Sequence, residues 1–76
     1  MKIVLEQDGG HLVMQVVEDK IINGHDWSWD TAVKDMSEEL GNRQGVRRMS
    51  YDTWHWDLRR QQEAEEYITY FYLKHE

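Results

Sequence analysis

The stretch "KIVLEQDGGHLVMQVVE" (residues 2–18) contains the most direct structural signal in this chain. Two runs rich in β-branched and aliphatic residues, about 2–7 and 11–18, flank Asp-Gly-Gly. Asp-Gly and Gly-Gly supply the positive φ angles that tight hairpin turns require. Alternate residues of a strand share a face, and one face of the second run is apolar: Leu12, Met14 and Val16. The stretch predicts an N-terminal antiparallel β-hairpin.

The segment after the hairpin admits a third strand. In "KIINGHDWSW", residues 20–29, an Asn-Gly turn signal precedes a short alternation of residue types. A strand there would extend the hairpin to a three-stranded meander. Trp27 and Trp29 would then point to the same side.

From Ser28 onward the apolar residues recur with the period of a helix. They fall at i, i+3, i+4, i+7 and i+11, on one helical face: Trp29, Ala32, Val33, Met36 and Leu40. Ser28 is the expected N-cap, and Gly41 stands where helices commonly end in a left-handed residue.

The C-terminal third predicts a second helix with Ser50 as its N-cap. Its first apolar face is formed by Tyr51, Trp54 and Leu58, and a later face, about a third of a turn away, by Ala64, Tyr67, Ile68 and Phe71. Either one long helix changes its contacts along its length, or the helix ends and residues 67–73 form an additional strand, which their Tyr, Ile, Thr and Phe content favours. We favour the helix, because no Gly, Pro or Asn interrupts residues 51–76.

These elements predict one small α+β domain spanning residues 1–76. It consists of the N-terminal antiparallel hairpin, or a three-stranded meander, packed against two C-terminal helices. A chain of this size buries only about 60% of the surface its unfolded form exposes. The four Trp, four Tyr and one Phe therefore matter for its core.

Composition excludes several classes of protein. The chain has no cysteine, and no apolar run approaches the roughly 20 residues of a membrane span. We therefore expect a cytoplasmic protein that does not enter the membrane. The four histidines are scattered and the serines are explained as caps or helix surface, so we expect neither an enzyme, nor a metal site, nor a cofactor.

The four tryptophans occur in two similar pairs, "HDWSWD" (25–30) and "DTWHWD" (52–57). On a helix, residues two apart point in different directions. We therefore expect Trp29 and Trp54 in the core and Trp56 on the surface. Residues 47–60 hold four Arg against two Asp, within a chain whose net charge is −6.

Trp, Tyr and Arg are the residue types enriched at binding hot spots. The C-terminal "YITYFYLKHE" also contains more aromatic rings than one helix face can bury: Tyr67, Tyr70, Phe71 and Tyr72. The candidate partner-binding residues are Arg47, Arg48, Trp56, Arg59, Arg60, Tyr67, Tyr70 and Tyr72.

The leading hypothesis is a non-enzymatic module that binds another protein. One alternative is a structural subunit that self-associates as a homo-oligomer. A second is nucleic-acid binding through residues 47–60, which the net charge of −6 disfavours. The size, acidity and order of elements resemble those of small phage-encoded inhibitors of host defences, such as anti-CRISPR and anti-restriction proteins. The resemblance covers no specific motif and transfers no functional residue. It implies acidic faces that imitate nucleic-acid phosphates and block a basic groove of a host protein.

Overall fold

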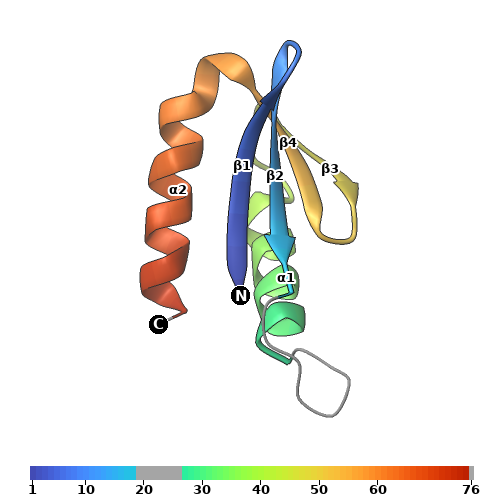
Figure 1. The fold of residues 1–76 in the computed structure, drawn as a ribbon, viewed down its shortest axis with the longest axis vertical. Helices are drawn as coiled ribbons and strands as arrows, with labels where there is room; N and C mark the ends of the chain where they lie inside the picture. The colour runs from blue at the N-terminus through green and yellow to red at the C-terminus, as the bar shows by residue number, and fades with distance from the viewer. Residues whose placement is uncertain (19–26, 76) are drawn as a thin grey trace.

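The computed structural model describes residues 1–18 and 27–75, which form a four-stranded antiparallel sheet and two main helices. In chain order the elements are β1 (Lys2–Asp8), β2 (His11–Val17), α1 (Trp27–Leu40), β3 (Val46–Ser50), β4 (Thr53–Asp57), the short 3-10 helix η1 (Leu58–Arg60) and α2 (Gln61–Lys74). The strand order is β1-β2-β4-β3 (Figure 1). The predicted α+β class is confirmed. Residues 19–26, which include most of the possible third strand, lie outside the described residues. The end of that predicted strand, 27–29, is helical, and the described sheet has four strands rather than the three of a meander.

The N-terminal hairpin is confirmed with nearly the predicted bounds. β1 and β2 pair from Lys2–Val17 to Asp8–His11, and Gly9 in the turn has a φ of 63°. A residue with a side chain is strained at that φ, which is why the Asp-Gly-Gly signal was informative. The alternation also holds, because Leu12, Met14 and Val16 are all buried.

The second hairpin replaces the first part of the predicted C-terminal helix. Residues 53–57 form β4, and α2 begins only at Gln61, so the prediction of a helix from residue 51 is wrong. β4 pairs with β2 as well as with β3, which places it inside the sheet. Residues 67–73 are helical, so the alternative of an additional strand there is also wrong.

Helix α1 has the apolar face that the sequence predicted. Ala32, Val33, Met36 and Leu40 are buried, and Trp29 packs partly buried against them. The helix begins at Trp27, so Ser28 lies inside it and the expected N-cap is wrong. The helix ends before Gly41 as expected, but the positive φ in the following loop belongs to Gly45, at 82°.

Both helices pack on the same face of the sheet. The core joins residues of β1, β2 and β4 to the buried faces of α1 and α2, and Figure 1 shows α1 behind the sheet and α2 beside β1. The Tyr72 hydroxyl of α2 accepts a hydrogen bond from the backbone N–H of Ile3 at 2.6 Å. This contact occupies one of the outward-pointing groups of the edge strand β1, which otherwise invite pairing with another chain.

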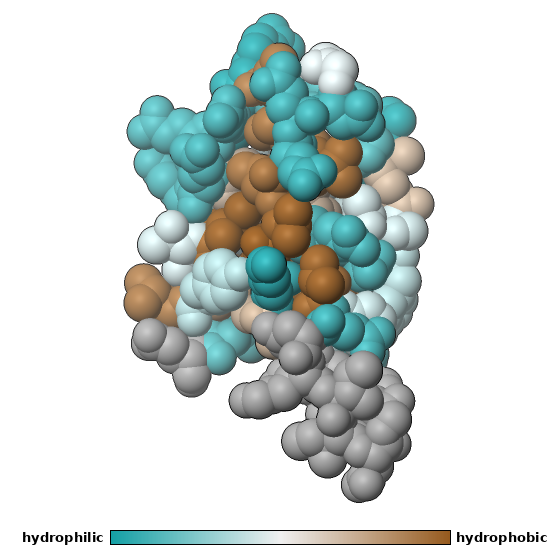
Figure 2. Space-filling view, viewed as in Figure 1, coloured by the Kyte–Doolittle hydropathy of each residue, from teal (hydrophilic) through white to brown (hydrophobic). Residues whose placement is uncertain are grey.

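The other face of the sheet has no helix over it among the described elements. Its apolar side chains are only half-buried: Val4, Val13 and Val17. Figure 2 shows hydrophobic residues gathered near the middle of the view that has β1 in front. In the described part of the chain, no helix is long and apolar enough to cross a membrane.

Replacement of Trp56 tests whether this indole is a core residue. Its side chain is 0% exposed, so Trp56→Ala should lower the free energy of unfolding by about 3–5 kcal/mol, the usual loss for a buried aromatic ring. Urea denaturation followed by circular dichroism measures this loss. Met49→Ala is the control, because Met49 is 48% exposed and its replacement should change stability little. Similar losses for the two variants would contradict this assignment.

Candidate functional site

Two of the eight predicted partner-binding residues lie in the core. Trp56 is fully buried and Tyr67 is 6% exposed, and their rings contact each other with centroids 5.9 Å apart. The expectation that they belong to a contact surface is wrong. In a strand, Trp54 and Trp56 point to one face, whereas the predicted helix would have turned Trp56 outward.

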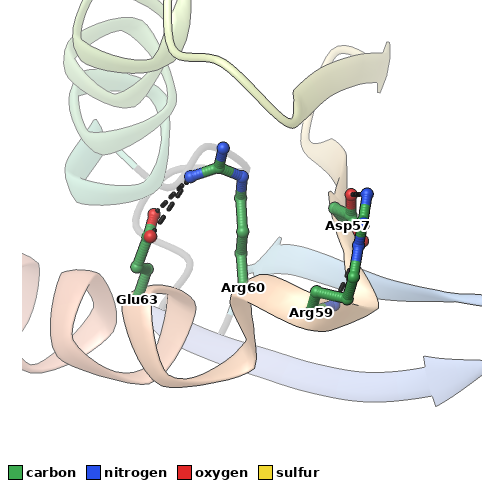
Figure 3. Close-up of polar contacts among 4 residues, drawn as sticks. All are labelled: Asp57, Arg59, Arg60 and Glu63. Atoms are coloured by element: carbon green, nitrogen blue, oxygen red, sulfur yellow. Dashed lines mark hydrogen bonds and ion pairs between the residues drawn. The ribbon is translucent and has the colours of Figure 1, made fainter.

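Three of the four predicted arginines are engaged within the protein. Arg59 pairs with Asp57 at 3.0 Å, and the Arg60 guanidinium contacts both carboxylate oxygens of Glu63 at 3.1 Å (Figure 3). Hydrogen bonds from Arg59 hold the pKa of Asp57 below its ordinary value. The positive charges of Arg59 and Arg60 are therefore compensated by neighbouring carboxylates.

Arg48 connects β3 and the β3–β4 turn to α1. Its guanidinium donates to the Ser37 hydroxyl at 2.8 Å and to the backbone carbonyl of Tyr51 at 2.6 Å. It also lies over the Trp54 ring, 5.3 Å from the centroid. These contacts give Arg48 a structural role. Neither Arg48 nor Arg47 has an ion-pair partner within residues 1–18 and 27–75, and Arg47 also makes no side-chain hydrogen bond there.

The predicted exposure of C-terminal aromatic residues is confirmed for Tyr70 and Tyr72. Tyr70 is 47% exposed, and its neighbour on the helix surface, Leu73, is 64% exposed. Tyr70 and Leu73 line a shallow hollow of about 500 Å³ together with four polar residues: Gln62, Glu65, Glu66 and Thr69. We call Glu65, Glu66, Thr69, Tyr70 and Leu73 the α2 surface.

The α2 surface is acidic as well as apolar. Glu65 and Glu66 accept long hydrogen bonds from the side-chain amides of Gln61 and Gln62, at 3.4 and 3.3 Å. Neither carboxylate has an ion-pair partner among the described residues. Two uncompensated negative charges therefore flank the exposed rim of Tyr70 and Leu73.

Contacts with α1 fix the C-terminal end of α2. The Tyr70 hydroxyl donates to Glu39 at 2.7 Å, and this hydrogen bond raises the pKa of Tyr70. Lys74 contacts Asp35 at 2.8 Å and Glu39 at 3.4 Å. The hydrogen bond from Lys74 is the largest influence lowering the pKa of Asp35, and His75 lowers it further. We call these contacts the α1–α2 clasp.

Of the five residues of the α2 surface, only Tyr70 was predicted from the sequence; Glu65, Glu66, Thr69 and Leu73 were not. Leu73 lies on α2 away from the buried residues Ala64, Tyr67 and Phe71. That separation was available from the 3.6-residue period. A strand at 67–73, the alternative left open by the sequence, would instead place Leu73 on the same side as Tyr67 and Phe71.

Within the described residues, no group of three or more His, Asp and Glu side chains converges as metal ligands do. Comparison with protein-family models, curated protein sequences and solved structures finds no match for this chain. The geometry of the surface is therefore the basis for a functional assignment.

The α1–α2 clasp predicts a pH-dependent contribution to stability. Lys74→Met removes the ammonium that holds the pKa of Asp35 down. A depressed carboxyl pKa stabilises the fold above the pKa of the unfolded chain, about 3.9 for Asp, and this stabilisation is lost as the pH falls through the folded value. The variant should therefore unfold at lower urea concentration than the wild type at about pH 7, and at nearly the same concentration at about pH 2.

Urea denaturation at the two pH values measures this difference. Lys34→Met is the matched control, because Lys34 pairs with Asp30 at 3.4 Å but is 71% exposed, and exposed pairs contribute little. A loss for Lys74→Met that is the same at both pH values would show that its contacts are not electrostatic.

Proposed function

We propose that this protein is a non-enzymatic module that binds another protein through the α2 surface. One observation carries the proposal: Tyr70 and Leu73 are strongly exposed beside a hollow whose glutamates have no cationic partner in the described chain. The partner that fits presents apolar side chains flanked by Lys or Arg. A basic amphipathic helix, with apolar residues spaced three and four apart, has this chemistry.

The apolar part of the surface supplies the binding free energy. Burial of exposed apolar area contributes about 25 cal/mol per Å², and Leu73 and Tyr70 are among the most exposed large hydrophobic residues of the protein. Tyr is also a common hot-spot residue, because it combines a large ring with a polar end. The Tyr70 ring is already held by Glu39, so little side-chain freedom is lost on binding.

The charged part of the surface supplies selectivity. Glu65 and Glu66 attract a basic partner and disfavour an acidic one. The same charges disfavour a second copy of this chain, because α2 packed against α2 brings like charges together. Direct nucleic-acid binding is also disfavoured, because Arg48, Arg59 and Arg60 already contact groups of the protein itself.

An inhibitor that blocks a basic surface of a host protein is consistent with this arrangement. An acidic, partly apolar helix can cover a basic groove and exclude the natural ligand of that groove. The mimicry that the resemblance to phage inhibitors implies, and action in the cytoplasm, are parts of the same proposal.

Charge-reversing variants in affinity capture from the native host test the proposal. Leu73→Lys removes apolar area and adds a repelling charge, yet a cation is favourable near the C-terminal end of a helix, so the fold should be retained. Glu66→Lys reverses one charge of the surface. We expect each variant to reduce capture of the partner by about tenfold or more, the effect of losing roughly 1.4 kcal/mol.

Matched controls separate this surface from the rest of the protein. Met49→Lys makes the same type of change at an exposed residue of β3, and Glu38→Lys makes it on the exposed side of α1. Both should capture the partner as the wild type does. Equal losses for Leu73→Lys and Met49→Lys, or self-association of the wild type that Leu73→Lys abolishes, would overturn the proposal.

A further inference from the structure

A second hollow, of about 520 Å³, lies where β2 begins and β4 ends. Its lining includes side chains from three adjacent strands: His11, Arg47, His55 and Asp57. None of them belongs to the α2 surface. Gly10 also lines this hollow, and a Cβ at Gly10 would meet no atom within 4 Å.

The strand register places the two histidines and Arg47 together on the face without helices. His55 lies directly opposite Arg47 across β3–β4, and directly opposite Val13 across β2–β4. His11, two residues before Val13, is therefore the diagonal neighbour of His55. The two imidazole rings stack with centroids 4.2 Å apart and an angle of 25° between their planes.

Polar groups without partners lie at this hollow. His11, which lines it, has a buried Nε2 without a hydrogen-bond partner in the described chain, and such atoms are uncommon in native structures. Arg47 also has no carboxylate partner among the described residues.

Three acidic residues lie on this face of the sheet close to the histidines. Asp57 lies across from His11 on β4, but its carboxylate already accepts from Arg59 at 3.0 Å. Asp8 lies across from His11 on β1, and Glu6 lies across from Val13 in the same cross-strand row as His55; both are exposed to solvent. Arg47 is the charged residue directly opposite His55.

We propose that this hollow binds a small oxyanion, either a phosphate or a carboxylate group. Arg47 supplies a permanent positive charge and donors in a fork that fits two oxygens of one anion. His55 adds an imidazole N–H, with His11 stacked behind it.

Titration of the full chain with inorganic phosphate, followed by NMR of the histidine ring resonances, tests this site. Sodium chloride keeps the ionic strength constant, and a parallel titration with acetate distinguishes a phosphate from a carboxylate ligand. We expect saturable shifts of the His11 and His55 resonances with at least one of these anions.

Arg47→Gln should weaken binding by about tenfold or more, because it removes the permanent charge and the charge-assisted hydrogen bonds to the anion. Lys2→Gln is the matched control, since Lys2 also points to the face without helices but lies at the far end of β1, across from Val17. It removes the same charge and should leave the affinity unchanged. His55→Phe keeps a ring against His11 without the nitrogens and should also weaken binding, with urea denaturation confirming that it folds.

Three results would overturn the proposal. Shifts that grow linearly with both anions would show that no site exists. Equal losses for Arg47→Gln and Lys2→Gln would show diffuse screening of surface charge. Binding that is unchanged in His55→Phe would exclude His55 from the site.

Discussion

Five residue pairs, from His11–Asp57 to Gln15–Thr53, join β2 to β4 and thereby join two hairpins into one sheet. A single hairpin is at best marginally stable in water, so neither hairpin is expected to persist without this ladder. The ladder also sets Trp56 opposite Leu12 and Trp54 opposite Met14. Both indoles consequently lie on the face that the helices cover, and the core of the protein is built around them.

The position of the helices on one face divides the molecule into two different surfaces. On the covered side, Arg43 lies over the rings of Trp56 and Tyr67, with centroid distances of 5.2 and 5.6 Å, and shields the end of the core. The α1–α2 clasp holds the helices together and leaves the α2 surface outward. On the other side, the sheet presents the stacked histidines and Arg47. The two proposals therefore concern separate surfaces with opposite charge preference.

The basic segment 47–60 has a different meaning in the folded protein from the one its composition suggested. Arg48, Arg59 and Arg60 each contact groups of the protein itself. Their charges hold the second hairpin to α1 and fix the entry into α2. Only the alternation along β3 distinguishes Arg47, which points to the face without helices, from Arg48, which points to the helices and reaches Ser37. Composition gives only the number of charged residues, whereas the strand register determines on which face of the sheet each of them lies.

Local sequence signals were sufficient for the first hairpin, for α1 and for the end of α1 before Gly41. Each depends on neighbouring residues alone: a glycine that tolerates positive φ in the turn, and an apolar period sustained over twelve residues of α1. The same period placed Ala64, Tyr67, Ile68 and Phe71 on one face, and three of them, Ala64, Tyr67 and Phe71, are buried, although Tyr67 was also predicted to contact a partner.

The stretch "YDTWHWD" is compatible with either a strand or a helix. Two tryptophans two residues apart lie on one face of a strand, and they disturb the apolar face of a helix only weakly. Its conformation depends on β2, some forty residues earlier in the chain, which offers a free edge to pair with. Burial of Trp56 and the separation of Arg47 from Arg48 follow from that long-range pairing. No local pattern specifies it, since backbone hydrogen bonds between strands carry no sequence signature of their own.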